Sequence, residues 1–187
     1  MMKSQKRKKM LKRKIIKRFV FIFLGTLVFS SCDKNISTKG VVDKTKIIEN
    51  TNRLLNDWHI AASEANFENY FSKMDSISIF IGTDASENWP KKQFIDFSKP
   101  YFDKGKAWSF TAIERNIYSN EDGSFIWFDE LLSTWMGICR GSGVIENKNN
   151  ELKIKQYVLS VTIPNDDIQS LIKLKQVKDS IFQLKFN

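Results

Sequence analysis

Residues 125–146 have the sequence FIWFDELLSTWMGICRGSGVIE, and they predict two long β-strands joined by a short turn. The expected strands run from Phe125 to Trp135 and from Ile138 to Glu146. The first strand is apolar at both parities, which a sheet with one solvated face does not tolerate. We therefore expect the outer sheet face to be covered, either by a partner subunit or by the C-terminal helix. The two apolar sets are Phe125, Trp127, Leu131 and Trp135, and Ile126, Phe128, Leu132 and Met136.

Strand and helix patterns continue on both sides of this hairpin. Residues 108–118 and 152–163 are further expected strands, and turn signals occur at 122–123 and 147–150. Upstream, apolar residues recur at helical spacing from Ile47 to Ala65, a short helix is expected at 67–74, a strand at 76–82, and a third helix from Pro90. An amphipathic helix should follow Pro164. This order predicts an α+β fold, in which a curved antiparallel sheet wraps like a cone around N-terminal helices.

The first 31 residues have the composition of a signal peptide. Residues 1–18 contain ten Lys or Arg and no acid, and an uncharged run of 11 residues follows, from Phe19 to Phe29. As a helix this run would rise ~16 Å, about half a hydrocarbon core, so it is a secretory segment and not a spanning one. The chain has 30 Lys and Arg against 21 Asp and Glu; without the leader the balance is 20 against 21. The remaining domain lacks the basic surface that nucleic-acid binding requires, so no nucleic-acid partner is expected.

Cys32 ends a segment, residues 27–32, that resembles the lipobox of bacterial lipoproteins. The resemblance implies cleavage before Cys32, acylation of its thiol and a stable lipid anchor. The protein would then be exported and anchored to the cell envelope, at the outer membrane or at the periplasmic face of the inner membrane. An uncleaved signal anchor and a plain secreted protein are the alternatives. Because an acylated Cys32 cannot form a disulfide, Cys139 is expected to be a buried free thiol.

Six segments between Lys46 and Pro164 resemble the SnoaL-like branch of the nuclear transport factor 2-like superfamily. They are residues 58–62, 79–84, 99–108, 127–130, 135–144 and 159–164. The resemblance implies a cystatin-like roll with an apolar cavity inside the cone. It implies no single activity, since the superfamily includes ketosteroid isomerase, scytalone dehydratase, polyketide cyclases and non-enzymatic modules. We divide the chain into a signal peptide (1–31), a lipidated Cys with its tether (32–44), a SnoaL-like domain (45–165) and a C-terminal amphipathic helix (166–187).

Two titratable residues are candidates for catalysis. His59 lies at the edge of the buried helical stripe, where it would act as an acid or base, or else seal the helix against the sheet. Asp129 shares strand parity with Trp127 and Trp135. If that face is concave, Asp129 is a desolvated carboxylate suited to a general base, and Glu130 faces the other way. The alternative for Asp129 is an ion pair with a nearby Arg, either Arg115 or Arg140.

Further residues are expected around a ligand pocket inside the cone. Arg140, among glycines, would reach a ligand anion, Asp129 or Glu87. The full set of pocket candidates is Trp58, His59, Asp84, Trp108, Asp129, Trp135, Arg140 and Tyr157. The chain has one His, no Cys-x-x-Cys and no metal-ligand spacing, so no metal or cofactor is expected.

Three functions are compatible with this sequence. The first is a membrane-anchored module that binds a small apolar ligand in the cone. The second is an isomerase, cyclase or dehydratase that uses an Asp and His pair, and the third is a dimerising interaction domain with a filled core. In each case a homodimer through the outer sheet face would cover its apolar strands.

Overall fold

The computed structural model describes residues 43–186. The predicted signal peptide, Cys32 and nearly all of the tether lie outside the described residues. Helix α2 (Lys44–Ser63) begins at Asp43, whose side chain accepts a hydrogen bond from the backbone N–H of Lys46 at 3.1 Å. Its buried positions follow the predicted stripe, and this spacing places them on one face of the helix. They are Ile47, Thr51, Leu55, Trp58, His59, Ala61 and Ala62.

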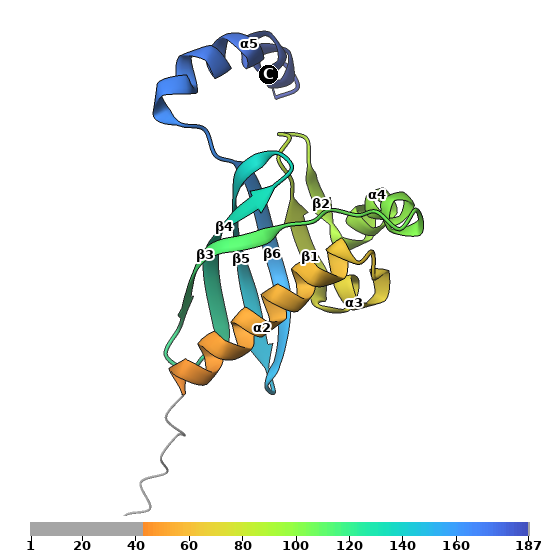
Figure 1. Ribbon diagram of the computed structural model, residues 1–187, viewed down its shortest axis with the longest axis vertical. Coiled ribbons are helices and arrows are strands. Elements are labelled where there is room, and N and C mark those ends of the chain that lie inside the picture. Colours follow the sequence, from red (N-terminus) through yellow and green to blue (C-terminus); the bar gives the residue numbers. More distant parts are fainter. Residues whose placement is uncertain (1–42, 187) are drawn as a thin grey trace, which may run out of the picture. The chain divides into compact units, whose positions relative to one another are not determined.

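Two shorter helices follow α2. Asn66 caps α3 (Phe67–Ser72) by accepting a hydrogen bond from the N–H of Asn69 at 3.1 Å. Helix α4 (Lys91–Asp103) starts directly after Pro90, as predicted. Figure 1 shows α2 lying diagonally across one face of the sheet. The helices therefore occupy the inner side of the cone.

The sheet has six strands in the order β2-β1-β6-β5-β4-β3. Their bounds are β1 (Met74–Ile81), β2 (Asn88–Pro90), β3 (Thr111–Ser119), β4 (Phe125–Thr134), β5 (Gly137–Lys148) and β6 (Glu151–Val161). The turn between β5 and β6 consists of Asn149 and Asn150, with φ values of 55° and 64°, which is the backbone that a two-residue hairpin turn needs. The α+β cone is thus confirmed, with helices first and a long hairpin meander after them.

One pair of strands departs from the predicted antiparallel sheet. Strand β1 pairs with β6 in parallel, and all other neighbours are antiparallel. The chain leaves β1 and passes through β2, α4 and three strands before it reaches β6, which is long enough for a parallel pairing. The three-residue strand β2 was not predicted. The sheet is therefore mixed.

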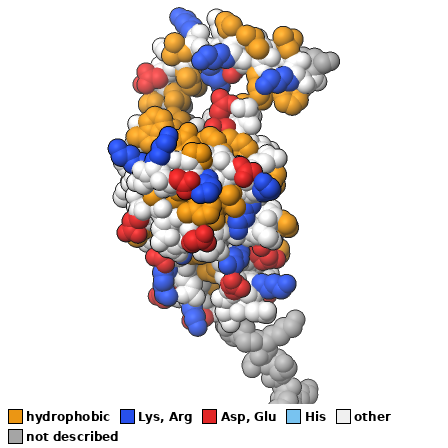
Figure 2. Space-filling view, turned by 90° about the vertical axis from the view of Figure 1, so that its right-hand side faces the viewer, with side chains coloured by type: hydrophobic (Ala, Val, Ile, Leu, Met, Phe, Trp, Pro, Cys, Tyr) orange, Lys and Arg blue, Asp and Glu red, His pale blue; other side chains and the backbone are white. Residues whose placement is uncertain are grey.

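The outer face of the meander is open in the described chain. Trp127, Phe125 and Tyr118 are 47%, 48% and 49% exposed. The C-terminal helix α5 (Ile168–Gln183), preceded by a 3₁₀ turn at Asn165–Asp167, contains no buried residue. Hydrophobic and Lys side chains lie side by side on α5 (top of Figure 2). The expectation that this helix covers the sheet is wrong, so the cover by a partner subunit stays a prediction.

The inside of the cone is filled by packed aromatic rings. Trp58 stacks on Tyr70 with centroids 4.9 Å apart, and Phe80 stacks on Phe94 at 3.9 Å. Cys139 is a buried free thiol, as predicted. Within residues 43–186, no helix has the length and apolar character needed to cross a membrane.

Candidate functional site

A buried carboxylate lies at the centre of the cone. Strand β4 directs Glu130 inward together with Ile126, Phe128 and Leu132, and the Glu130 side chain is 0% exposed. His59 Nε2 lies 2.8 Å from Glu130 Oε1, and the Tyr157 hydroxyl donates to the same oxygen at 3.0 Å. Arg115 Nε donates to Oε2 at 2.8 Å, and Nη2 lies 2.7 Å from that oxygen without hydrogen-bond geometry. We call these four residues the Glu130 cluster.

The Glu130 cluster links the first helix to three strands. Its members come from α2, β3, β4 and β6. Arg115 Nη1 also donates to Asn56 Oδ1 at 2.8 Å and to Asn52 Oδ1 at 3.0 Å, both on α2. One guanidinium thus satisfies the buried carboxylate and holds α2 against β3, which is a use that suits the fork of Arg.

The cluster fixes the protonation of its members. Burial by itself raises the pKa of Glu130, but the hydrogen bond and charge of His59, with those of Arg115, outweigh it and leave the pKa lowered. Burial, and then the charge of Glu130, raise the pKa of Tyr157 well above its usual value. Glu130 is therefore an anion at neutral pH, Tyr157 keeps its proton, and His59 Nε2 is the donor in its bond to Glu130.

This arrangement leaves Glu130 little capacity for proton transfer. Its two oxygens receive three hydrogen bonds and one close ionic contact from the chain itself. A carboxylate with a lowered pKa and occupied lone pairs is a weak base. His59 is 5% exposed and holds α2 to the sheet, which is the sealing role considered for it.

Asp129 and Arg140 lie on the opposite face of the sheet. The expectation that Asp129 faces the concave side is wrong, because the pleat of β4 directs Glu130 inward and Asp129 outward. Asp129 Oδ1 lies 3.2 Å from Arg140 Nη1, and the side chains are 31% and 53% exposed. Asp129 therefore forms an ion pair with Arg140, which was the alternative to a role as general base. Neither residue joins His59, so the predicted Asp and His pair does not form.

The remaining candidates fall in three places. Trp58 and Tyr157 are in the filled core, with ring centroids 4.8 Å apart. Asp84 accepts hydrogen bonds from the N–H and hydroxyl of Ser86 at 2.8 and 2.6 Å, so it shapes a local turn. Trp108 and Trp135, the latter 82% exposed, line a hollow of about 150 Å³.

We call this space the aromatic hollow. Its wall consists of aromatic rings with Met136, Leu159, Gly82 and Thr83, and its only charged lining residue is Glu87. Phe97, which is 41% exposed, belongs to α4, and hydrophobic side chains emerge among the charges on the face shown in Figure 2. The aromatic members are Phe80, Trp89, Phe94, Phe97, Trp108, Phe110 and Trp135.

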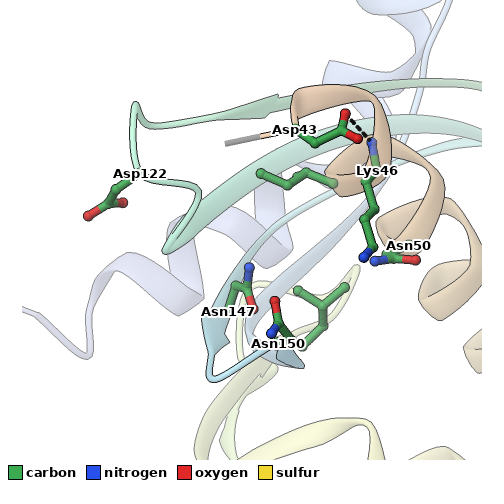
Figure 3. A pocket seen from close by; sticks show the side chains of 8 residues that line it. Asp43, Lys46, Asn50, Asp122, Asn147 and Asn150 are labelled. Atoms are coloured by element: carbon green, nitrogen blue, oxygen red, sulfur yellow. Dashed lines mark hydrogen bonds between the residues drawn. The ribbon is translucent and has the colours of Figure 1, made fainter. Parts of the chain in front are cut away.

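A second hollow, of about 200 Å³, is polar. It lies beside the start of α2 and is lined by Asp43, Lys46, Asn50, Asp122, Asn147 and Asn150, with Ile47 and Leu152 (Figure 3). Asp43 caps the helix, and Asp122 accepts from the N–H and hydroxyl of Ser124 at 2.9 and 2.6 Å. Its carboxylates serve turns and a cap. Among residues 43–186, no three His, Cys, Asp or Glu side chains are placed to hold a metal ion.

Sequence reasoning missed the two residues that organise these sites. Glu130 is the single charge in an otherwise apolar row of β4, with Ile126, Phe128 and Leu132, and that contrast could have identified it as a buried, paired carboxylate. Glu87 was considered as a possible partner of Arg140, which pairs with Asp129 instead. Glu87 is two residues from Trp89 of β2, but no local pattern places it in one hollow with Trp108 and Trp135, because that depends on the fold.

Comparisons with known proteins support the fold. The SnoaL-like domain family matches residues 51–164. No curated protein matches the chain. A nuclear transport factor 2-like protein of unknown function from Pseudomonas putida is similar at 8% identity and a TM-score of 0.55, over 65% of this chain and 90% of that one. A domain of unknown function with a cystatin-like fold from Nostoc punctiforme is similar at 13% identity and a TM-score of 0.56, over 76% of this chain and 99% of that one. At these identities the likeness concerns the fold alone.

Proposed function

We propose that this chain, which belongs to the SnoaL-like domain family, is a lipid-anchored envelope protein that binds a small, largely apolar ligand in the aromatic hollow. The observation that carries the proposal is the wall of seven aromatic rings around a space of about 150 Å³. Ligand sites are typically apolar hollows with few polar groups, and this one has a single carboxylate.

Binding is favoured over catalysis by the chemistry of the lining. A general acid or base must lie within hydrogen-bond reach of the proton that it transfers, so a catalytic site needs titratable groups in its lining. Glu87 is the only titratable residue among those that line the aromatic hollow. The Glu130 cluster is occupied by its own hydrogen bonds, so it offers no second group.

The anchor part of the proposal rests on the leader sequence. Cys32 follows an uncharged run of 11 residues and a lipobox-like segment. Cys32→Ala should abolish palmitate labelling and release the protein from the membrane fraction, or leave it unprocessed. Unchanged labelling in this variant would contradict the anchor without bearing on ligand binding.

A homodimer through the outer sheet face also belongs to the proposal. Tyr118 and Trp127 stack there with centroids 6.1 Å apart, and both are about half exposed. Exposed apolar clusters of this kind mark interaction surfaces, and a second copy would cover both strands. Sedimentation of the protein at tens of micromolar, with the lipid removed, should give a dimer, and a monomer would refute it.

The ligand site is tested with two matched tryptophan variants. Trp135→Ala removes a ring of the hollow that is 82% exposed, and Trp127→Ala removes one that is 47% exposed on the outer face. Indole and toluene, as neutral apolar probes at ten times their dissociation constants, should stabilise the wild type by about 1.4 kcal/mol. The stabilisation should disappear in Trp135→Ala and persist in Trp127→Ala. Equal loss in both variants would contradict the site.

A further inference from the structure

We infer that the aromatic hollow selects a small organic cation, of the tertiary or quaternary ammonium class, through ring faces and the Glu87 carboxylate. This inference rests on the proposed function and names the ligand class. It is carried by three features of the hollow, which are a fixed carboxylate, a wall of aromatic rings that no cation of the described chain covers, and a small volume.

Glu87 is held in place at the edge of the hollow. Its Oε2 accepts a hydrogen bond from the N–H of Asp84 at 3.1 Å, and its backbone carbonyl accepts one from the N–H of Gly82 at 2.9 Å. A side chain at position 82 would collide with the Glu87 carboxylate, so the glycine makes room for it. Among residues 43–186, no Lys, Arg or His forms an ion pair with Glu87. The hollow therefore contains one ordered negative charge without a cation.

The rings beside Glu87 form a continuous wall. Trp89 stacks on Phe97 with centroids 4.4 Å apart and planes inclined by 26°, and Phe94 stacks on Trp108 at 5.7 Å and 30°. The face of an aromatic ring is its negative side, and it attracts a cation within about 6 Å. The cation–π contacts of the described chain involve two other rings, Phe67 and Phe182. No cation of the described chain lies over the rings of the hollow, so the parts of these rings that line it are open to a cationic ligand.

A wholly neutral ligand leaves the charge of Glu87 unmatched. It would remove solvent from a carboxylate whose Oε2 accepts a hydrogen bond from the N–H of Asp84 but which has no counter-charge, and desolvating a charge without a counter-charge is unfavourable. An ammonium group with alkyl substituents satisfies both the carboxylate and the apolar wall. The hollow has a volume of about 150 Å³, so the ligand group that enters it must be small.

The test compares choline with its neutral isostere 3,3-dimethyl-1-butanol. Radiolabelled choline is bound at equilibrium to the full chain in nanodiscs, and the isostere competes for it. Choline should bind at least about tenfold more tightly, which corresponds to 1.4 kcal/mol, because its charge is attracted by the carboxylate and by the ring faces and the isostere has none. Glu87→Gln should weaken choline about tenfold and leave the isostere unchanged. Trp135→Leu should weaken it about threefold or more, because the ring face is lost. Glu114→Gln, an exposed carboxylate of β3, is the matched control.

Each outcome has a separate meaning. Equal affinity for choline and its isostere, or no effect of Glu87→Gln, overturns the cation inference while apolar binding stands. Failure of both probes, with Trp135-dependent binding of indole or toluene, also overturns it and keeps the proposed function. If none of these probes binds, the proposed function itself fails.

Discussion

Glu130→Gln is the substitution that tests how the cone is held together. The variant keeps the shape of the side chain and removes its charge. Whichever way the amide is oriented, its NH₂ group faces either Arg115 or the His59 and Tyr157 donors, which lie 2.7 to 3.0 Å from the present oxygens. Buried donors then lose their acceptor, and Arg115, whose side chain is 6% exposed, becomes an uncompensated charge.

The expected loss of stability is large for one substitution. Removing one partner of a buried ion pair costs about 3–5 kcal/mol. Proteins of this size have about 5–15 kcal/mol in total, so the change takes a substantial share. At about 2–4 °C per kcal/mol, the melting temperature should fall by roughly 10 °C. Urea denaturation followed by circular dichroism measures the free energy, and a thermal scan measures the midpoint.

Asp129→Asn is the matched control, because it changes the neighbouring carboxylate on the other face. Its pair with Arg140 is part-exposed, at 31% and 53%, so it should contribute less than about 1 kcal/mol. A Glu130→Gln variant as stable as the wild type would refute the assignment of Glu130 as the buried organiser. Equal losses of stability in both variants would contradict the placement of Glu130 on the buried face and Asp129 on the more exposed face.

Three further predictions concern the same framework. The pKa of Glu130 is lowered in the folded state, so the stability that its charge contributes is complete above the unfolded pKa of about 4.3 and is lost as pH falls through the lower folded pKa. Glu130→Gln should remove this part of the acid dependence of stability, as measured by urea titration from pH 7 to 3. Gly141→Ala should destabilise the protein by about 1–3 kcal/mol, because the new Cβ collides with the Tyr157 hydroxyl and crowds Glu130. Gly137→Ala is the comparison: its Cβ meets no atom, but its backbone φ is 86°, so this variant separates the effect of collision from that of backbone strain. Removal of residues 165–187 should change the free energy of unfolding by less than about 1 kcal/mol, because α5 has no buried residue, and a larger loss would show that the helix packs on the domain.

Most of the fold could be predicted because its signals are local. The helical stripe of α2 and the turn at Asn149 and Asn150 each depend on a few neighbouring residues. The parallel pairing of β1 with β6 could not, since it joins segments about 75 residues apart and leaves no local pattern. The same limit explains β2, whose three residues are ordered by β1 and not by their own propensity.

The candidate site was predicted less well, for a reason that lies in β4. Apolar residues occur on both faces of β4, so the alternation of side chains along the strand could not indicate which face points into the cone. Trp127 and Trp135, which share the strand parity of Asp129, suggested that this parity faces the concave side, whereas bulk is no measure of burial on a strand with two apolar sides. Trp127 is 47% exposed and Trp135 is 82% exposed, while the smaller Ile126 and Leu132 are fully buried.

The separation of the two sites has a structural origin. The Glu130 cluster joins α2, β3, β4 and β6, which form the long framework of the cone. The aromatic hollow is built mostly from other segments: β2, α4, the loop around Trp108, and the turn that follows β4. Ring contacts connect them: the centroids of Phe80 and Tyr157 are 5.7 Å apart, and those of His59 and Phe110 are 6.2 Å apart. Glu130, whose charge is fully paired within the chain, stabilises the framework, whereas Glu87, which has no cationic partner among the described residues, faces the hollow. Loss of ligand binding and loss of stability should therefore be separable in this protein, because the two carboxylates belong to different parts of the fold.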